Sequence, residues 1–312
     1  MTHTLSPKYA RYAVTVFFAV FLLLGNAAGS DDHSQYAQYA PFVETGRQGM
    51  VATANVQASD AGADILRKGG NAVDAAVAAS FAVSVTRPQS TGIGGGGFLL
   101  LYLAKEKKTL AFDFRERAPL KATRDMYIRD GEAVPALSRT GPLAVGVPGL
   151  VAGLLEVHKK YGSLPITDVM AAAIRLAEEG FPVYPSLAQA FGYREEMLGQ
   201  SPATRAVYFR NDQILGEGDV LIQKDLAKTL QAIAAEGKDA FYTGPIAQAI
   251  VVEMKKQGGL ITHEDLESYT VLSRTPTSGT FQNAQIYSMP PPSSGGVLIV
   301  QMLNVLSGFP IQ

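Results

Sequence analysis

Arg115 occupies the position in this sequence that best fits recognition of a charged ligand. It comes at the end of an apolar, strand-like stretch in AFDFRERAP, and Pro119 soon ends regular structure. A planar guanidinium at the end of a strand can bind a carboxylate through two parallel hydrogen bonds. The same side chain could equally form a structural ion pair with Asp113, Glu116 or a more distant acid. The residues alone leave both interpretations open, and Arg117 provides a neighbouring arginine on the same strand face for comparison.

The glycine run before that strand matches a nucleotide-binding pattern in its spacing. Gly92, Gly94 and Gly97 spell GxGxxG, which binds phosphate only where it joins a strand to the start of a helix. Here the run is followed by FLLLYLAKEKKTLAFDF, which is typical of strands. The sequence therefore predicts a glycine-rich turn where the backbone passes close to another element. A nucleotide-dependent oxidoreductase is an alternative that rests on the spacing alone.

Other reactive side chains form no recognisable constellation. The chain has no cysteine and no GxSxG motif, which leaves no thiol nucleophile, no disulfide and no nucleophile elbow. His33 and His263 are isolated, and His158, among charged neighbours, is expected to be a solvated helix residue. Ser293 and Ser294, before two glycines, could serve as a nucleophile or an anion-binding nest, but capping of the last helix explains them without chemistry. No metal or cofactor is predicted.

The first 29 residues have the pattern of a secretory signal peptide. Lys8 and Arg11 give a positive start, residues 13–24 are almost wholly apolar, and residues 25–29 are small enough for cleavage. The apolar run is shorter than the roughly 20 residues that a membrane-spanning helix needs. We therefore expect export to the periplasm or the medium, with an uncleaved anchor as the alternative.

The charge balance argues against polyanionic partners. The whole chain has 27 basic and 28 acidic residues, and removal of Lys8 and Arg11 leaves 25 against 28, a net charge of −3. Such a balanced chain is not expected to bind nucleic acid or an anionic membrane. Without disulfides an exported protein must be held by its core. The 47% hydrophobic content of the chain is enough for that, which suits a bacterial periplasmic domain.

The elements that must position Arg115 are a mixture of strands and helices. Residues 98–104 and 109–116 predict two strands joined by a charged turn, and residues 49–56 predict a buried strand. A helix is expected from Ser59 or Asp60, followed by a helix capped by Asn71 that is apolar nearly all round. Further helices are predicted at 150–161, 166–179, 224–236, 245–258 and 297–306, a helical turn capped by Thr262 and Asp265, and strands at 278–282 and 285–289. Neither a repeat nor a linker is found.

Several segments, taken together, resemble the γ-glutamyltransferase family. They are GMVATANVQASDAGADILRKGGNAVDAAVAASFAVSVTRPQSTGIGGGGFLL, DFRERAP, GPLAVGVPGLVAGLLEVHKKYG and YSMPPPSSGG, in that order and spacing. The similarity runs from about Gly46 to Leu306. It implies an α+β fold of the N-terminal-nucleophile hydrolase type, in which two β-sheets pack between helical layers.

The resemblance also implies an activity and a role for Arg115. In this family a precursor cleaves itself into a large and a small subunit, and the threonine that opens the small subunit attacks the γ-glutamyl carbonyl. Glutathione is the usual donor, and water, an amino acid or a peptide accepts the glutamyl group. The arginine of DFRE falls on Arg115, which by resemblance binds the α-carboxylate of the glutamyl group.

By the same resemblance, the catalytic threonine would lie beyond Gln312. Residues 1–29 are then a signal peptide, and residues 30–312 are the large-subunit region, truncated before the nucleophile. No catalytic residue is assigned within this chain, so these 312 residues alone are not expected to turn over a γ-glutamyl donor. A periplasmic module that holds an amino acid or peptide through Arg115 without turnover is the alternative from another class of protein.

The leader gives the first testable prediction. The exported protein should begin near Ser30, because cleavage after Gly29 has Ala27 three positions before it. N-terminal sequencing of the periplasmic or secreted fraction measures this directly. A membrane-bound form that still begins at Met1 would contradict the prediction.

Overall fold

The computed structural model describes residues 45–310. The chain divides into two units, Met1–Gln48 and Gly49–Gln312, and every helix and strand given below belongs to the second. The predicted leader at 1–29 lies outside the described residues. Among the described residues, no helix is both long and apolar enough to cross a membrane.

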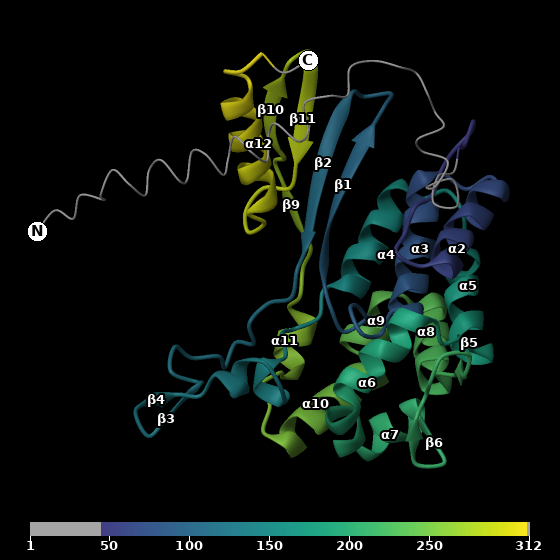
Figure 1. Cartoon of the computed structure of the whole chain (residues 1–312), viewed down its shortest axis with the longest axis vertical. Coiled ribbons are helices and arrows are strands. Elements are labelled where there is room, and N and C mark those ends of the chain that lie inside the picture. Colours follow the sequence, from purple (N-terminus) through teal and green to yellow (C-terminus); the bar gives the residue numbers. More distant parts are fainter. Residues whose placement is uncertain (1–44, 311–312) are drawn as a thin grey trace, which may run out of the picture. The chain divides into compact units, whose positions relative to one another are not determined.

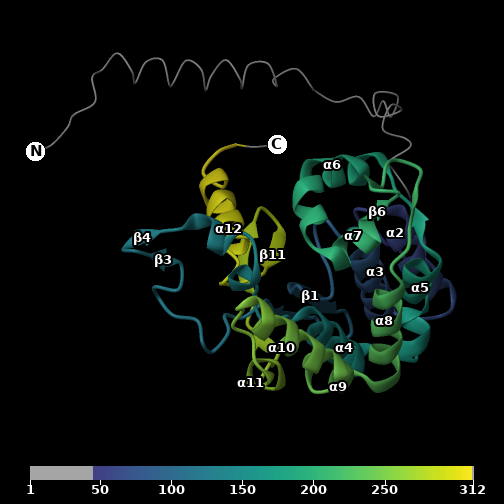
Figure 2. The same ribbon diagram turned by 90° about the horizontal axis from the view of Figure 1, so that it is seen from below.

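A helical body surrounds α3 (Ala72–Thr86). α3 contacts α2 (Val56–Arg67), α4 (Leu150–Tyr161) and α5 (Ile166–Glu179), and α5 in turn contacts α8 (Lys224–Glu236), as the view in Figure 2 shows. A helix that is apolar on every side is stable only when neighbours cover most of it. The all-round hydrophobicity of α3 therefore explains why three helices pack against it.

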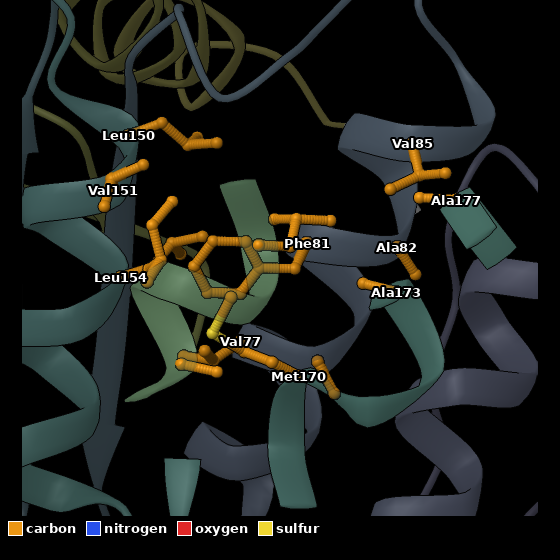
Figure 3. Packing of buried hydrophobic residues seen from close by; sticks show 14 of the residues in the cluster. Val77, Phe81, Ala82, Val85, Leu150, Val151, Leu154, Met170, Ala173 and Ala177 are labelled. Atoms are coloured by element: carbon orange, nitrogen blue, oxygen red, sulfur yellow. The ribbon is translucent and has the colours of Figure 1, made fainter. Parts of the chain in front are cut away.

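Phe81 is at the centre of this body (Figure 3). Its side chain is fully buried and lies among Val77 of its own helix, Leu150 and Leu154 of α4, and Met170 of α5. The alanines that fill much of the rest of α3 let the neighbouring helices approach closely, so one large ring can fill the space between three helices.

A three-stranded antiparallel sheet carries the candidate site. β1 (Gly97–Leu103) and β2 (Lys108–Phe114) form a hairpin, and β9 (Leu272–Arg274) pairs with the other edge of β2, which makes β2 the central strand (Figure 1). The α4 helix covers one face of β2, where the Phe112 and Tyr161 rings meet edge to face at 6.0 Å.

The remaining elements are short and surround this frame. A β10–β11 hairpin packs against α12, whose apolar side chains, among them Val297, Ile299 and Met302, are largely exposed. The bounds are β3 Ile128–Arg129, β4 Glu132–Ala133, η2 Pro135–Ser138, η3 Pro142–Ala144, β5 Phe181–Pro182, α6 Pro185–Gln200, α7 Pro202–Tyr208, β6 Phe209–Arg210, β7 Gln213–Ile214, β8 Val220–Leu221, α9 Lys238–Tyr242, α10 Pro245–Gln257, α11 His263–Glu267, β10 Thr277–Phe281, β11 Ala284–Ser288 and α12 Gly295–Leu306.

Most of the predicted elements are confirmed, and one is wrong. The helices at 150–161, 166–179 and 224–236 have the predicted bounds, and the hairpins at 98–116 and 278–289 are present within a residue or two. The strand predicted at 49–56 does not form. Instead Asn55 caps α2 by accepting a hydrogen bond from the amide of Ala58, so the helix begins at Val56, before Ser59 and Asp60.

Asp74 is a completely buried carboxylate in the first turn of α3. It closes a capping box with Asn71 and also accepts hydrogen bonds from the hydroxyl and amide of Ser163 and from the amide of Leu164. Burial by itself raises the pKa of Asp74, but the hydrogen bonds from Ser163, Asn71 and Leu164 outweigh it and lower the pKa below 3.8. Asp74 thus ties the start of α3 to the loop that follows α4.

His158 also belongs to this cluster, contrary to the prediction that it is solvated. Its side chain is only 11% exposed, and its Nε2 lies 3.3 Å from Oδ1 of Asp74. The charged neighbours of His158 in the sequence point outward, whereas its own position on α4 faces the start of α3. Adjacent residues of a helix point in different directions, so one turn can carry both solvent-exposed side chains and a side chain that faces another helix.

Replacing Asp74 by asparagine should destabilise the protein in a pH-dependent way. An amide cannot accept from all the amide and hydroxyl donors that now meet the carboxylate, so at pH 7 the loss should be about 1–3 kcal/mol or more. Because the folded-state pKa is lowered, the stabilisation by Asp74 is present above pH 3.8 and disappears as the pH falls through the folded-state value.

Urea unfolding of Asp74→Asn and the wild type at pH 7 and pH 3 measures this difference. The gap in free energy of unfolding should narrow at pH 3. Asp64→Asn is the matched control, since Asp64 is an exposed acid paired with Arg67 on α2 and should change stability by less than about 0.5 kcal/mol. Equal stability of the Asp74→Asn variant at pH 7 would contradict the prediction.

Candidate functional site

Arg115 follows directly after the last residue of β2 and presents its side chain to solvent. The side chain is 58% exposed, and Cζ lies 5.5 Å from the centre of the Phe98 ring. Its Nε is 3.4 Å from a carboxylate oxygen of the adjacent Glu116. An exposed ion pair of this kind contributes little to stability. The guanidinium is therefore accessible to a ligand and rests on an aromatic ring.

The buried acid beside Arg115 is paired with a different arginine. Oδ2 of Asp113 accepts a hydrogen bond of 2.6 Å from Nε of Arg274 on the neighbouring strand β9. Its Oδ1 accepts the backbone amide of Arg115 at 3.1 Å. Asp113, which is 6% exposed, thus has its charge compensated by Arg274 and holds the peptide of Arg115. The Arg115 guanidinium contacts the exposed Glu116 carboxylate and the Phe98 ring instead.

The glycine run packs against the same stretch of backbone, as the sequence predicts. A Cβ at Gly96 would lie 2.8 Å from the amide nitrogen of Glu116, closer than real side chains come. The carbonyl of Gly95 accepts the amides of Gly149 and Leu150, both at 2.9 Å, at the start of α4. The run leads into strand β1 and not into a helix, so the geometry of a dinucleotide-binding turn does not form.

Tyr269 contacts the backbone of Arg115. Its side chain is buried, and its hydroxyl donates a hydrogen bond of 2.7 Å to the carbonyl of Arg115. Burial raises the pKa of Tyr269 to about 12, with Arg117 acting against the increase, so the hydroxyl keeps its proton at neutral pH. Gly149 makes this approach possible, because a Cβ there would collide with both the Tyr269 hydroxyl and the Phe114 carbonyl.

Arg117 occupies a different environment from Arg115, although the sequence suggests a common strand face. It lies beyond β2, where its backbone forms a bridge with Val147. Its Nη2 donates to the carbonyl of Thr270 at 2.7 Å, and its guanidinium lies 5.0 Å from the centre of the Tyr269 ring. Arg117 is thus used to hold the loop after α11, and only one of the two arginines is available to a ligand.

A serine does precede α12, as predicted, but its side chain does not make the predicted capping hydrogen bond. Ser294 is the residue before α12, yet its side chain makes no capping hydrogen bond. Its backbone is already helical, with φ −76° and ψ −21°, whereas a capping side chain reaches the helix amides from an extended backbone. Sequence reasoning also missed Arg274 and Tyr269, although a lone acid inside an apolar strand, Asp113, is a signal that a distant cation must exist.

The arrangement provides an exposed cationic fork on an immobilised backbone. Both polar backbone groups of Arg115 are satisfied from the interior, by Asp113 and Tyr269. Only the side chain of Arg115 is left to interact with solvent or a ligand. A guanidinium so placed is suited to hold a planar carboxylate through two hydrogen bonds.

The fold is that of the N-terminal-nucleophile hydrolases, which confirms the predicted α+β class. The crystal structure of the γ-glutamyltranspeptidase of Helicobacter pylori superposes with a TM-score of 0.83 at 42% sequence identity, covering 86% of this chain and 77% of that chain.

The chain belongs to the Gamma-glutamyltranspeptidase family, whose sequence model matches residues 58–312. The glutathione hydrolase proenzyme of Escherichia coli K12 is 49% identical over 265 residues, covering 84% of this chain and 46% of the relative. The glutathione hydrolase proenzyme of Bacillus subtilis 168 is 44% identical over 302 residues, covering 95% and 51%. The chain thus spans about half the length of these relatives.

Alanine at position 149 should strongly destabilise the protein. The backbone of Gly149, at φ −120°, suits any residue, so the cost should come from the collision of Cβ with Tyr269 and the Phe114 carbonyl. We expect a loss of about 1–3 kcal/mol or more in urea unfolding, as for overpacked cores.

Gly192→Ala is the matched control, because Gly192 lies within α6 with open space around it. That substitution should stabilise the protein by about 0.5–1 kcal/mol through helix propensity. A Gly149→Ala variant as stable as the wild type would show that the turn before α4 has room for a Cβ beside Tyr269 and the Phe114 carbonyl, contrary to the prediction.

Proposed function

We propose that this chain is part of a γ-glutamyl hydrolase and transferase and that it holds the α-carboxylate of the donor. Arg115 is the residue that binds this carboxylate. The exposed guanidinium on an immobilised backbone is the observation that carries the proposal. Membership of the family and relatives named glutathione hydrolase proenzyme support it. Glutathione or another γ-glutamyl compound is the proposed donor.

The proposed reaction uses a threonine nucleophile located outside this chain. The threonine oxygen forms an ester with the γ-carbonyl carbon, the amide bond of the donor breaks, and the departing amine takes up the proton lost by the hydroxyl. Water, an amino acid or a peptide then attacks the ester and releases the glutamyl group. In this scheme the 312 residues alone are inactive, and the nucleophile comes from a small subunit cleaved from the same precursor.

Arg115 would act by binding and orientation. The donor carries a carboxylate on its α-carbon, three bonds from the γ-carbonyl that reacts, so fixing the carboxylate restricts where the carbonyl can lie. A bidentate guanidinium contact fixes orientation as well as position. A Lys side chain could supply the charge but not the planar geometry.

The proposal includes the cellular setting predicted from the sequence. Export rests on the leader pattern of residues 1–29, and the small subunit is the proposed protein partner. Neither a cofactor nor a metal has a role in this scheme, and nucleic acid and stable membrane insertion are not part of it. A binding module without turnover would use Arg115 in the same way, so turnover separates the two functions.

Replacing Arg115 should impair use of the donor in a protein that spans the full length of the family. Arg115→Ala leaves the carboxylate without its partner, and a charge-assisted contact is worth about 1.5–3 kcal/mol, so kcat/KM should fall roughly ten- to a hundredfold or more. Arg115→Lys should recover only part of this loss. The release of p-nitroaniline from γ-glutamyl p-nitroanilide measures both.

Arg117→Ala is the control, because Arg117 is committed to Thr270 and Tyr269. It should lower Tm in a circular-dichroism melt while costing much less in kcat/KM than Arg115→Ala. Equal kinetic losses in the two alanine variants, or normal kinetics in Arg115→Ala, would return Arg115 to a structural role. A full-length wild type that binds glutathione without any turnover would favour the binding module.

A further inference from the structure

We infer that Tyr269 is a positioning residue for the donor's α-carboxylate and acts by fixing the peptide that carries Arg115. This inference rests on the function proposed for Arg115. The contact that carries it is the hydrogen bond of 2.7 Å from the Tyr269 hydroxyl to the Arg115 carbonyl, between residues 154 positions apart. The side chain of Tyr269 is buried, and its hydrogen bond to Arg115 is made with the backbone carbonyl, so its influence on a ligand passes through the backbone of Arg115.

The hydroxyl of Tyr269 is itself held in place. The ring stacks on Tyr242, with centres 5.8 Å apart and planes 21° apart, and the Arg117 guanidinium covers it at 5.0 Å. The carbonyl of Tyr269 accepts a hydrogen bond of 2.7 Å from Nζ of Lys238. Because the ring and the main chain of Tyr269 are both held, its hydroxyl defines one position for the Arg115 carbonyl that it bonds.

The amide of Arg115 is fixed at the other end of the residue by Asp113. With one anchor on the amide and another on the carbonyl, the Cα–Cβ bond of Arg115 has a set direction, and only the side-chain torsions remain free. Fewer conformers of the guanidinium then have to be excluded when a carboxylate binds. Loss of the hydrogen bond to the Arg115 carbonyl should therefore weaken binding of the γ-glutamyl donor more than it slows the reaction of the bound donor.

Tyr242 provides a matched control for a purely structural role. Its hydroxyl is also buried, donates to the carbonyl of Pro148 at 2.9 Å and accepts the amide of Ala152 at 3.2 Å. Burial raises the pKa of Tyr242, as it does that of Tyr269. Removing the Tyr269 hydroxyl costs one hydrogen bond and removing the Tyr242 hydroxyl costs two, in the same stacked pair, but only Tyr269 is bonded to Arg115.

The experiment compares Tyr269→Phe with Tyr242→Phe in the full-length protein, using γ-glutamyl p-nitroanilide as the donor. Tyr269→Phe should raise KM about three- to tenfold, the effect of one neutral hydrogen bond, with kcat within about twofold of wild type. Tyr242→Phe should lower Tm by at least as much as Tyr269→Phe does, and it should leave KM within about twofold of the wild type. A rise in KM of equal size in both variants would overturn the inference.

A double-mutant cycle with Arg115→Ala separates this inference from the proposed function. If Tyr269 acts through Arg115, Tyr269→Phe should add less than about a twofold change in kcat/KM in the Arg115→Ala background. If Tyr269→Phe lowers kcat/KM as much in the Arg115→Ala background as in the wild type, the positioning role is overturned, while Arg115 remains the residue that binds the carboxylate. Normal kinetics in Arg115→Ala alone would overturn the proposed function and this inference with it.

Asp113→Asn tests the other anchor and serves if Tyr269→Phe fails to fold. It weakens the contact with Arg274 and the hold on the Arg115 amide while the Tyr269 hydroxyl stays in place. KM for the same donor should again rise about three- to tenfold with a smaller change in kcat. An unchanged KM in a folded Asp113→Asn variant would contradict the inference.

Discussion

The close approach of three segments to the backbone at residues 114–116 is the constraint on which the candidate site depends. The glycine loop, the turn before α4 and Tyr269 all reach this stretch of backbone. Gly96 and Gly149 are required at the two closest contacts because no Cβ fits there. The part-buried peptide groups of Arg115 gain partners from Asp113 and Tyr269, so the close packing leaves neither its amide nor its carbonyl unsatisfied.

The helical body gives this site a rigid base. The α4 helix packs on one face of β2 and on α3, so it joins the core around Phe81 to the strand that ends at Arg115. The carbonyl of Gly95 satisfies the first amides of α4, which ties the helix to the glycine loop as well. Asp74 anchors the other end of α4 by holding the loop at Ser163. The helix that supports the site is thus fixed at both ends.

Local signals in the sequence predicted the elements, and contacts between distant segments decided the site. The helix at 150–161 has an apolar period and a glycine stop, and the hairpin around residues 105–108 has a charged turn, so both were predictable. The run at 49–56 is short and apolar, a pattern shared by strands and loops that lead into helices. His158 was misjudged because its neighbours in sequence are charged, while Asp74, which it faces, lies on another helix.

The position of Arg115 at a strand end was visible in the sequence, and its resemblance to a family motif suggested a ligand. Its accessibility was not predictable, because it depends on Arg274 taking the charge of Asp113. Nothing near Tyr269 in the sequence marks it as a partner of Arg115. Side chains that act over such separations leave no periodic or short-range pattern, so only the folded chain brings them together.

That separation has a consequence for synthesis. Tyr269 follows Arg115 by 154 residues, and a ribosome adding about 5–20 residues per second needs about 8–30 s to make that stretch. During this time the β1–β2 hairpin has been synthesised, whereas Tyr269 and β9 have not. The edge of β2 that will receive β9 stays unpaired, a state in which exposed strands are prone to associate. The carbonyl of Arg115 therefore cannot reach its final partner until translation has passed Tyr269, which follows α11, and the edge of β2 cannot be paired until β9 has been made.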